Sequence, residues 1–117
     1  DTLYADGEYK PDHTLCMKMG KEGIMNAYLP DIRSYGFTWW RNLIPQLKEY
    51  KMFASPHAFG NMLKTHYISH IAAAFGNVVT IEGVTCLSDD IDYGDYRIKS
   101  GEIQVSDAPG FGMKLLK

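Results

Sequence analysis

Four polar side chains follow four apolar segments of the chain at a nearly constant interval. They are Glu8, Asp31, His57 and Glu82, and the intervals between them are 23, 26 and 25 residues. Carboxylates bind hard cations, and histidine is a usable base near neutral pH. Charges gathered at one edge of a sheet repel one another unless a cation or a substrate joins them, so stability alone does not explain them. The pattern therefore indicates a functional site, although 14 acidic residues also offer some even spacing by chance.

The segments that precede these side chains have the character of buried parallel strands. They lie at residues 2–5, 26–29, 51–54 and 78–81, and each combines apolar, β-branched or aromatic residues with Gly or Pro near its exit. Helix-length segments separate them: 11–23, ending at a glycine that can occupy the C′ position, 39–50 with Thr38 as N-cap, and 61–75 with Leu63, Tyr67, Ile71 and Ala74 on one face. Trp40, Leu43, Ile44 and Leu47 form the apolar face of the second helix, and Pro45 predicts a kink or local break in it.

Strand–helix alternation at this interval predicts an α/β fold with a parallel sheet. One strand, one helix and two loops take about 25–30 residues, which is the repeat of a (β/α) barrel, where catalytic side chains lie at the carboxyl ends of strands. After Glu82 the character changes: residues 87–95 read as an acidic loop, 96–98 and 103–105 as a β-hairpin around a 99–102 turn, and 108–112 as an irregular tail.

Length and composition limit the class of protein. The chain has 117 residues, 45% of them hydrophobic, and a net charge of −2, which gives no reason to expect nucleic acid or a membrane surface as partner. No apolar run approaches the ~18 residues of a membrane span. Asp1 is not followed by a secretion leader, and we expect a cytoplasmic protein in which Cys16 and Cys86 are reduced thiols that pack in the fold.

Five short motifs in register resemble the mandelate racemase and muconate lactonizing enzyme-like branch of the enolase superfamily. They are Ala5-Asp6-Gly7-Glu8, Leu29-Pro30-Asp31-Ile32-Arg33, Ser55-Pro56-His57, Ile81-Glu82-Gly83 and Pro109-Gly110-Phe111-Gly112. The resemblance implies the C-terminal half of a (β/α)₇β TIM-like barrel: about four parallel strands with helices over residues 1–87, then a tail with a β-hairpin over 88–117 that returns towards a capping domain. The N-terminal capping domain and the first barrel half would be absent.

The resemblance also implies a role for each of the four side chains. Glu8 matches a carboxylate ligand of Mg²⁺, Asp31 and His57 match a catalytic dyad, and Glu82 matches an acid that hydrogen-bonds the substrate carboxylate. A metal and a hydrogen-bonding acid are needed because a proton α to a carboxylate is very weakly acidic. An aspartate beside the histidine fixes its tautomer, and the imidazolium can then protonate a departing β-hydroxyl.

The function implied is Mg²⁺-dependent dehydration of an acid sugar to a 2-keto-3-deoxy acid, the work of a lyase. The alternatives are a racemase or epimerase of a hydroxy acid, which needs a second base on an earlier strand, and a catalytically silent sugar-acid-binding or scaffold relative. The other metal ligands belong to earlier strands, so we expect this chain to be an inactive fragment that requires the missing N-terminal half and forms a homo-oligomer.

For other residues whose types could bind a ligand or react, we expect packing or surface roles. His66 and His70 stand four apart on the third helix without a further ligand, and Asp90, Asp92 and Asp95 miss the spacing of a calcium loop. The stretch from Gly20 to Gly23 lacks the frame of a phosphate-binding loop. Trp39 and Trp40 are expected to pack between helix and sheet rather than to form a lid. Arg33 could face the same mouth as Asp31 and pair with an acid there.

Overall fold

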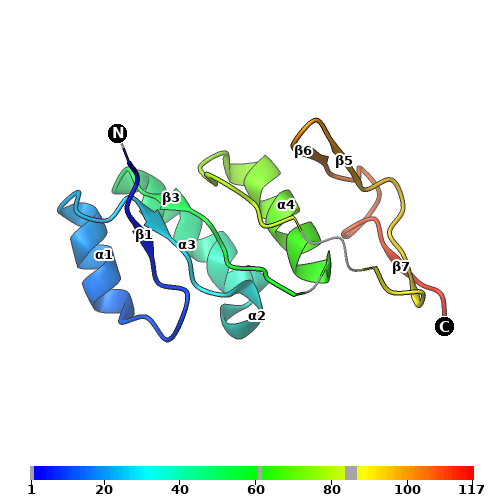
Figure 1. Cartoon of the computed structure of the whole chain (residues 1–117), viewed down its shortest axis with the longest axis horizontal. Helices are drawn as coiled ribbons and strands as arrows, with labels where there is room; N and C mark the ends of the chain where they lie inside the picture. The colour runs from blue at the N-terminus through cyan, green and yellow to red at the C-terminus, as the bar shows by residue number, and fades with distance from the viewer. Residues whose placement is uncertain (1, 61, 84–86) are drawn as a thin grey trace.

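Three short parallel strands, β1 (Ala5–Asp6), β2 (Ala27–Tyr28) and β3 (Phe53–Ala54), form the sheet on which the site is built. The computed structural model describes residues 2–60, 62–83 and 87–117. Helix α1 (His13–Lys21) connects β1 to β2, and helices α2 (Ile32–Tyr35) and α3 (Phe37–Glu49) connect β2 to β3. Helix α4 (Met62–Phe75) follows β3 (Figure 1). The predicted α/β fold with a parallel sheet is confirmed.

The two faces of the sheet differ in what covers them. Register pairs Asp6 with Tyr28 and Tyr28 with Ala54, and Tyr28 and Ala54 are both fully buried in the core cluster. The helical part of that cluster consists of Trp40, Leu43, Ile44 and Leu47 from α3, as predicted, and Ile68 and Ile71 from α4. Residues that alternate with these along the strands lie on the other face, where Phe53 is 38% exposed. One face therefore carries the core. The other, the open face, is buried at Ala27 in the central strand and exposed at Ala5 and Phe53 in the outer strands.

The predicted fourth strand over 78–81 is wrong as a strand. Val78 forms only an isolated parallel bridge with Ala54, through the hydrogen bonds Ala54 N–H to Asn77 O and Val79 N–H to Ala54 O. The next ladder bond would need an N–H from Pro56, and proline has none. The segment nevertheless runs beside β3, so it still delivers Glu82 to the same edge of the sheet.

Helix α1 ends as its sequence predicts, and the amino-terminal edge of the sheet is formed by such turns. Gly23 follows the C-cap of α1 with φ +73°, and Gly76 follows α4 with φ +73°. The left-handed conformation at C′ closes the last turn of a helix. Each glycine leads directly into the next strand segment, at the end of the sheet opposite to Asp31 and His57.

Two details of the second predicted helix are wrong. Helix α3 begins at Phe37 with Gly36 as its N-cap, so Thr38 lies inside the first turn and does not cap it. The reason is the short helix α2, which was not predicted and ends at Gly36 with φ +88°. Helix α3 also continues through Pro45 without a break, because the buried face on either side holds it against the sheet.

The buried face of α4 differs from the predicted one. Its buried residues are Met62, Thr65, His66, Ile68, Ser69 and Ile71. Of the predicted face only Ile71 is fully buried, and Ala74 is exposed. Both the sheet and the tail cover α4, and together they determine which of its residues are buried. The apolar repeat alone therefore predicts the wrong buried face. The predicted start of this helix at Asn61 lies outside the described residues.

The tail forms two small antiparallel pairs. Strands β5 (Arg97–Lys99) and β6 (Glu102–Gln104) pair through a turn in which Ser100 and Gly101 have φ +54° and +80°. Strand β4 (Ile91–Asp92) pairs with β7 (Lys114–Leu115), so the predicted acidic loop and the irregular end of the tail are joined by a ladder that the sequence did not reveal. The tail extends the long axis of the molecule, 47 Å by 27 Å by 23 Å (Figure 1).

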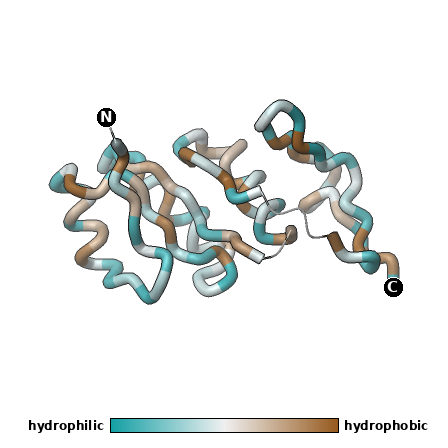
Figure 2. The backbone as a smooth tube through the Cα atoms, in the orientation of Figure 1, coloured by the Kyte–Doolittle hydropathy of each residue, from teal (hydrophilic) through white to brown (hydrophobic). Residues whose placement is uncertain are grey.

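Apolar surface remains exposed at both ends of the molecule. Figure 2 shows hydrophobic segments on the strands and again near the C-terminus, where Leu115 is 79% exposed. Of the two cysteines, Cys16 is a free thiol, and Cys86 lies outside the described residues. No helix in the described ranges has the length and apolarity that crossing a membrane requires.

Candidate active site

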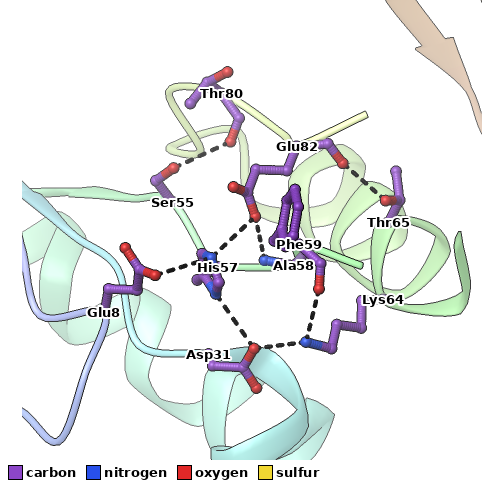
Figure 3. A network of polar contacts seen from close by, with 10 residues as sticks. All are labelled: Glu8, Asp31, Ser55, His57, Ala58, Phe59, Lys64, Thr65, Thr80 and Glu82. Carbon is purple, nitrogen blue, oxygen red and sulfur yellow. Dashed lines mark hydrogen bonds and ion pairs between the residues drawn. The ribbon is translucent and has the colours of Figure 1, made fainter. Parts of the chain in front are cut away.

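The carboxyl edge of the sheet brings the four predicted side chains together around one imidazole. His57 Nδ1 lies 3.4 Å from Asp31 Oδ2, and His57 Nε2 lies 3.2 Å from Glu8 Oε1 and 3.8 Å from Glu82 Oε2 (Figure 3). The imidazole is 21% exposed and Asp31 is 17% exposed, whereas Glu8 and Glu82 are 60% and 40% exposed. The ring thus has an inner nitrogen on the aspartate and an outer nitrogen on the two glutamates.

Backbone pairing places Asp31 next to His57. The two residues form a parallel bridge in the same register as β2 and β3, with Ile32 N–H donating to His57 O at 3.0 Å and His57 N–H donating to Pro30 O at 3.2 Å. In-register residues of parallel strands project on the same side. The short ladder therefore brings the two side chains together independently of the hydrogen bond between them.

Asp31 is also the N-cap of α2. Its Oδ1 accepts the N–H of Ser34 at 2.9 Å, which satisfies one donor of the first turn. Its Oδ2 faces His57 and also Lys64 Nζ, at 2.7 Å. Burial raises the pKa of Asp31, but the hydrogen bonds from Lys64 and Ser34 and the charge of Lys64 outweigh it and lower that pKa to about 2. Asp31 is therefore a carboxylate at neutral pH.

A glycine allows Glu8 to reach the site. Gly7 is buried with φ +103°, and a Cβ at this position would collide with the ring of Tyr28. The Gly7 N–H donates to Asp6 Oδ1 at 2.6 Å, which closes the turn after β1. Only glycine combines this backbone conformation with so close an approach, so the Asp-Gly-Glu sequence directs the carboxylate of Glu8 towards His57.

Glu82 is held at both its main chain and its side chain. The buried hydroxyl of Thr65 on α4 donates to Glu82 O at 2.8 Å, and Glu82 Oε2 accepts the N–H of Ala58 (Figure 3). The Ser55 hydroxyl contributes a further bond to Thr80 O, at 3.4 Å. These bonds keep the last segment beside β3 where the ladder stops at Pro56.

A cavity of about 510 Å³ opens beside the imidazole. Its lining is Glu8, Tyr9, Lys10, Asp31, Ser34, Tyr35 and His57. A larger cavity, of about 720 Å³, lies between α4 and the helices that follow β2 and is lined by Arg33, Phe37, Phe59 and Lys64 among others, but by none of the four predicted residues. The smaller cavity is the candidate active site, because among the described residues it is there that an imidazole and carboxylates converge.

Two residues of the site were missed by sequence reasoning, and one was misassigned. Lys64 and Thr65 stand next to each other on α4, for which the sequence pattern predicted an apolar packing face and no part in the site. Arg33, considered as a partner for an acid at the mouth, is exposed and makes no ion pair within the described ranges; Lys64 supplies that cation. The one available signal was a lysine and a threonine in the first turns of the helix after His57.

Among the described residues, no group of three or more His, Cys, Asp or Glu side chains is arranged to hold a metal ion. His66 is buried against the rings of Tyr93 and Tyr96, and burial lowers its pKa. Trp40 is buried in the core, and Trp39 contacts Trp40, Tyr35 and His13 edge-on or tilted. The catalytic and metal-binding roles of Glu8, Asp31, His57 and Glu82 stay predictions.

Comparison with known proteins relates this arrangement to one family. A family model described as enolase C-terminal domain-like matches residues 5–117. The structure of galacturonate dehydratase from Geobacillus sp., complexed with D-galacturonate and 5-keto-4-deoxy-D-galacturonate, superposes with a TM-score of 0.91 at 31% identity, over 98% of this chain and 31% of that chain. No curated protein sequence matches significantly.

Two further solved structures are similar. A mutant of the Geobacillus sp. galacturonate dehydratase complexed with Mg has a TM-score of 0.90 at 32% identity, over 97% of this chain and 29% of that chain. A mandelate racemase/muconate lactonizing protein from Geobacillus sp., complexed with magnesium and tartrate, has a TM-score of 0.89 with the same identity and coverage. The chain therefore spans about three-tenths of the length of these relatives.

Proposed function

Since this chain belongs to the enolase C-terminal domain-like family, we propose that it is the part of a Mg²⁺-dependent enzyme that removes the proton α to the carboxylate of an acid sugar. The reaction we propose is dehydration to a 2-keto-3-deoxy acid, catalysed by a lyase. The observation that carries the proposal is His57, held by Asp31 on one nitrogen and facing Glu8, Glu82 and a cavity with the other.

His57 is the base in this proposal. Asp31 engages Nδ1, which directs the lone pair of Nε2 to the cavity in the neutral ring. The α-proton moves to Nε2, and the resulting imidazolium can return that proton to the β-hydroxyl as the carbon–oxygen bond breaks and water leaves. The product is an enol, which becomes the 2-keto acid. One imidazole thus serves as base and then as acid, and the proton balance closes without another group of this chain.

Glu8 fits one position of a Mg²⁺ site. Its carboxylate is an oxygen ligand, the kind that Mg²⁺ prefers, and it is open enough to reach a metal, at 60% exposure. One carboxylate cannot hold the ion, so the proposal requires further ligands from a part of the protein outside this chain. When bound, Mg²⁺ would stabilise negative charge on the substrate carboxylate. Glu82, which faces the same nitrogen of His57 as Glu8, would hydrogen-bond that same carboxylate.

The open face of the sheet supports the proposal that another part of the same protein covers it. Phe53 and Val79 are 38% and 43% exposed, and Leu3, before β1, is 47% exposed. In a closed barrel the inner strand faces are covered by one another. We propose that residues 1–87 are the last strands of such a barrel, that residues 88–117 are its tail, and that the first half of the same protein covers the open face.

The ligands of the relatives support an acid sugar as the substrate class. Galacturonate dehydratase was solved with D-galacturonate, and the mandelate racemase-like protein was solved with magnesium and tartrate. Both organic ligands are hydroxy acids, in which a carboxylate adjoins a hydroxylated carbon. The cavity beside His57 is lined largely by polar side chains, which suits such a ligand.

The test uses the full-length protein that contains this chain, with Mg²⁺, in a screen of acid sugars for 2-keto product and for deuterium uptake at the α-carbon in D₂O. His57→Asn should remove both signals while Mg²⁺ binding persists, because asparagine offers no base; a positioned base is worth ~10²–10⁴-fold. Glu8→Gln is the matched control: it keeps the base and should weaken Mg²⁺ binding, with activity recovered in part at high metal.

The outcomes separate the alternatives. Deuterium uptake with inversion of configuration and no keto product would indicate a racemase or epimerase. Binding of an acid sugar without exchange in the parent protein would indicate a silent relative. If His57→Asn exchanged the α-proton at the parental rate, the assignment of His57 as base would be wrong.

A further inference from the structure

Lys64 reaches across from α4 to the far side of the Asp31–His57 pair. Its Nζ lies 2.7 Å from Asp31 Oδ2, the oxygen that also faces His57 Nδ1 (Figure 3). The two side chains are only 14% and 17% exposed, so this is a shielded ion pair rather than a surface one. Such a pair is screened less by solvent and salt than an exposed pair.

Lys64 completes the bonding of the Asp31 carboxylate. Ser34 N–H holds Oδ1, and Lys64 and His57 share Oδ2, so the plane of the carboxylate cannot rotate without breaking a bond. Lys64 Nζ also donates to Phe59 O at 3.3 Å, on the loop that carries His57. One ammonium group therefore links α4, the N-terminus of α2 and the loop after β3.

Lys64 stands outside the substrate cavity. It lines the larger cavity behind Asp31 and is not among the residues that line the cavity beside His57. Asp31, Glu8 and Glu82 place three carboxylates around one imidazole. A cation behind Asp31 offsets one of these charges and keeps that carboxylate ionised, without competing for the substrate.

We propose that Lys64 is a positioning residue for the reaction: it holds the Asp31 carboxylate ionised and aimed at Nδ1 of His57, which leaves Nε2 directed at the substrate. The functional unit is then Lys64–Asp31–His57 rather than a pair. This inference rests on the proposed function, since it assigns Lys64 a part in the step that His57 performs. The low pKa of Asp31 agrees with it.

The experiment compares Lys64→Met and Lys64→Arg in the full-length protein with its metal, with Lys48→Met as control. Lys48 is an exposed lysine of the last turn of α3. Lys64→Met should lower kcat by ~10–100-fold, the range for loss of a residue that orients a functional side chain. It should change KM by less than about 3-fold, since Lys64 does not touch substrate. Lys64→Arg should restore most of kcat, and Lys48→Met should match the parent.

A double-mutant cycle distinguishes positioning from general support of the fold. If Lys64 acts through Asp31, Lys64→Met should cost less than about 2-fold in an Asp31→Asn background, because the group it orients is already gone. If the loss of kcat in the double variant equalled the product of the losses in the two single variants, the proposal would be overturned. A parental kcat for Lys64→Met would also overturn it. If Lys64→Met does not fold, Lys64→Gln, which keeps a donor without the charge, takes its place in the cycle.

A second measurement tests the role of Lys64 independently of the proposed function. The side-chain ¹³C resonance of Asp31, followed over pH in the same proteins, should report a higher pKa in Lys64→Met than in the parent and in Lys48→Met. If no acid exchanges its α-proton in the parent, the proposed function fails, while this titration still tests whether Lys64 keeps Asp31 ionised. An unchanged pKa of Asp31 would overturn the inference even in an active enzyme.

Discussion

At the scale of single residues, the site depends on side chains that each serve two purposes. Asp31 caps a helix with one oxygen and holds an imidazole and a lysine with the other. Glu82 is fixed through its carbonyl by Thr65 and through its carboxylate by the Ala58 N–H. A residue bonded in this way stabilises the fold and orients the chemistry together, so its replacement is expected to affect both.

Asp31 should make stability depend on pH in the acid range. Its pKa in the folded protein is about 2, below the value of roughly 3.9 of an unfolded chain. As pH falls, the unfolded state takes up the proton first, so the stabilisation is fully present above about pH 5 and is lost progressively as pH falls towards 2. The stability difference between the parent and Asp31→Asn, from urea unfolding, should therefore narrow from pH 5 to pH 3. A difference independent of pH would contradict this.

At the scale of elements, the sequence predicted the three parallel strands of the sheet and the edge at which four polar side chains meet. It could do so because a strand, a helix and their loops repeat at a steady interval, and because parallel strands end at one edge. The residue Lys64 could not be found this way. It lies 33 residues from Asp31 on a helix, and only the packing of α4 against the start of α2 brings the two side chains together.

Other elements were missed for physical reasons that differ from case to case. Helix α2 has four residues, too few for any apolar repeat to show. Strands β4 and β7 have two residues each and depend on a partner more than 20 residues away. The predicted fourth strand stops because Pro56 cannot donate to the ladder. The helix was too short to show a repeat, and the strands are decided by contacts with distant residues rather than by local preference.

The packing of α1 on the sheet can be tested at Gly20. A Cβ there would overlap the side chain of Met52, which is 2% exposed. Overpacking costs about 1–3 kcal/mol and the helix preference of alanine returns roughly 1 kcal/mol. Gly20→Ala should therefore destabilise the parent yet stabilise a Met52→Ala variant, in which the space is open. Unfolding free energies in urea provide the measurement.

Gly83→Ala is the control for this pair. Among the described residues, a Cβ at Gly83 would meet only Ile98 Cδ1, at 3.9 Å, so its effect on stability should stay within about 0.5 kcal/mol. If Gly20→Ala destabilised both the parent and the Met52→Ala variant equally, Met52 would not be the residue that limits the approach of α1.

At the scale of the whole molecule, the open face of the sheet should control how the chain behaves alone. The exposed Leu3, Phe53 and Val79 form part of a surface that water does not favour. We expect the 117-residue chain, purified by itself, to associate with copies of itself. Light scattering should then give a mass above the 13.2 kDa of one chain.

A substitution on this face tests the cause. Phe53→Ser should reduce association, whereas Tyr9→Ser should not, although Tyr9 is the more exposed ring at 81%, because it lies on a loop and not on the sheet. A monodisperse monomer of the unmodified chain would show that the open face needs no cover.

The turns at Gly23 and Gly76 have a consequence for how this molecule can change in length. Both lie at the amino-terminal edge of the sheet, and no atom of the part of the chain that the structure describes lies within 4 Å of where a Cβ would stand at either glycine. Residues added there would extend into solvent and leave each strand and its terminal side chain in place. Residues added after the strands would instead move Glu8, Asp31, His57 or Glu82 out of register with the others. Descendants of this sequence can therefore acquire new loops at one edge, while the proposed reaction would keep the spacing at the other edge fixed.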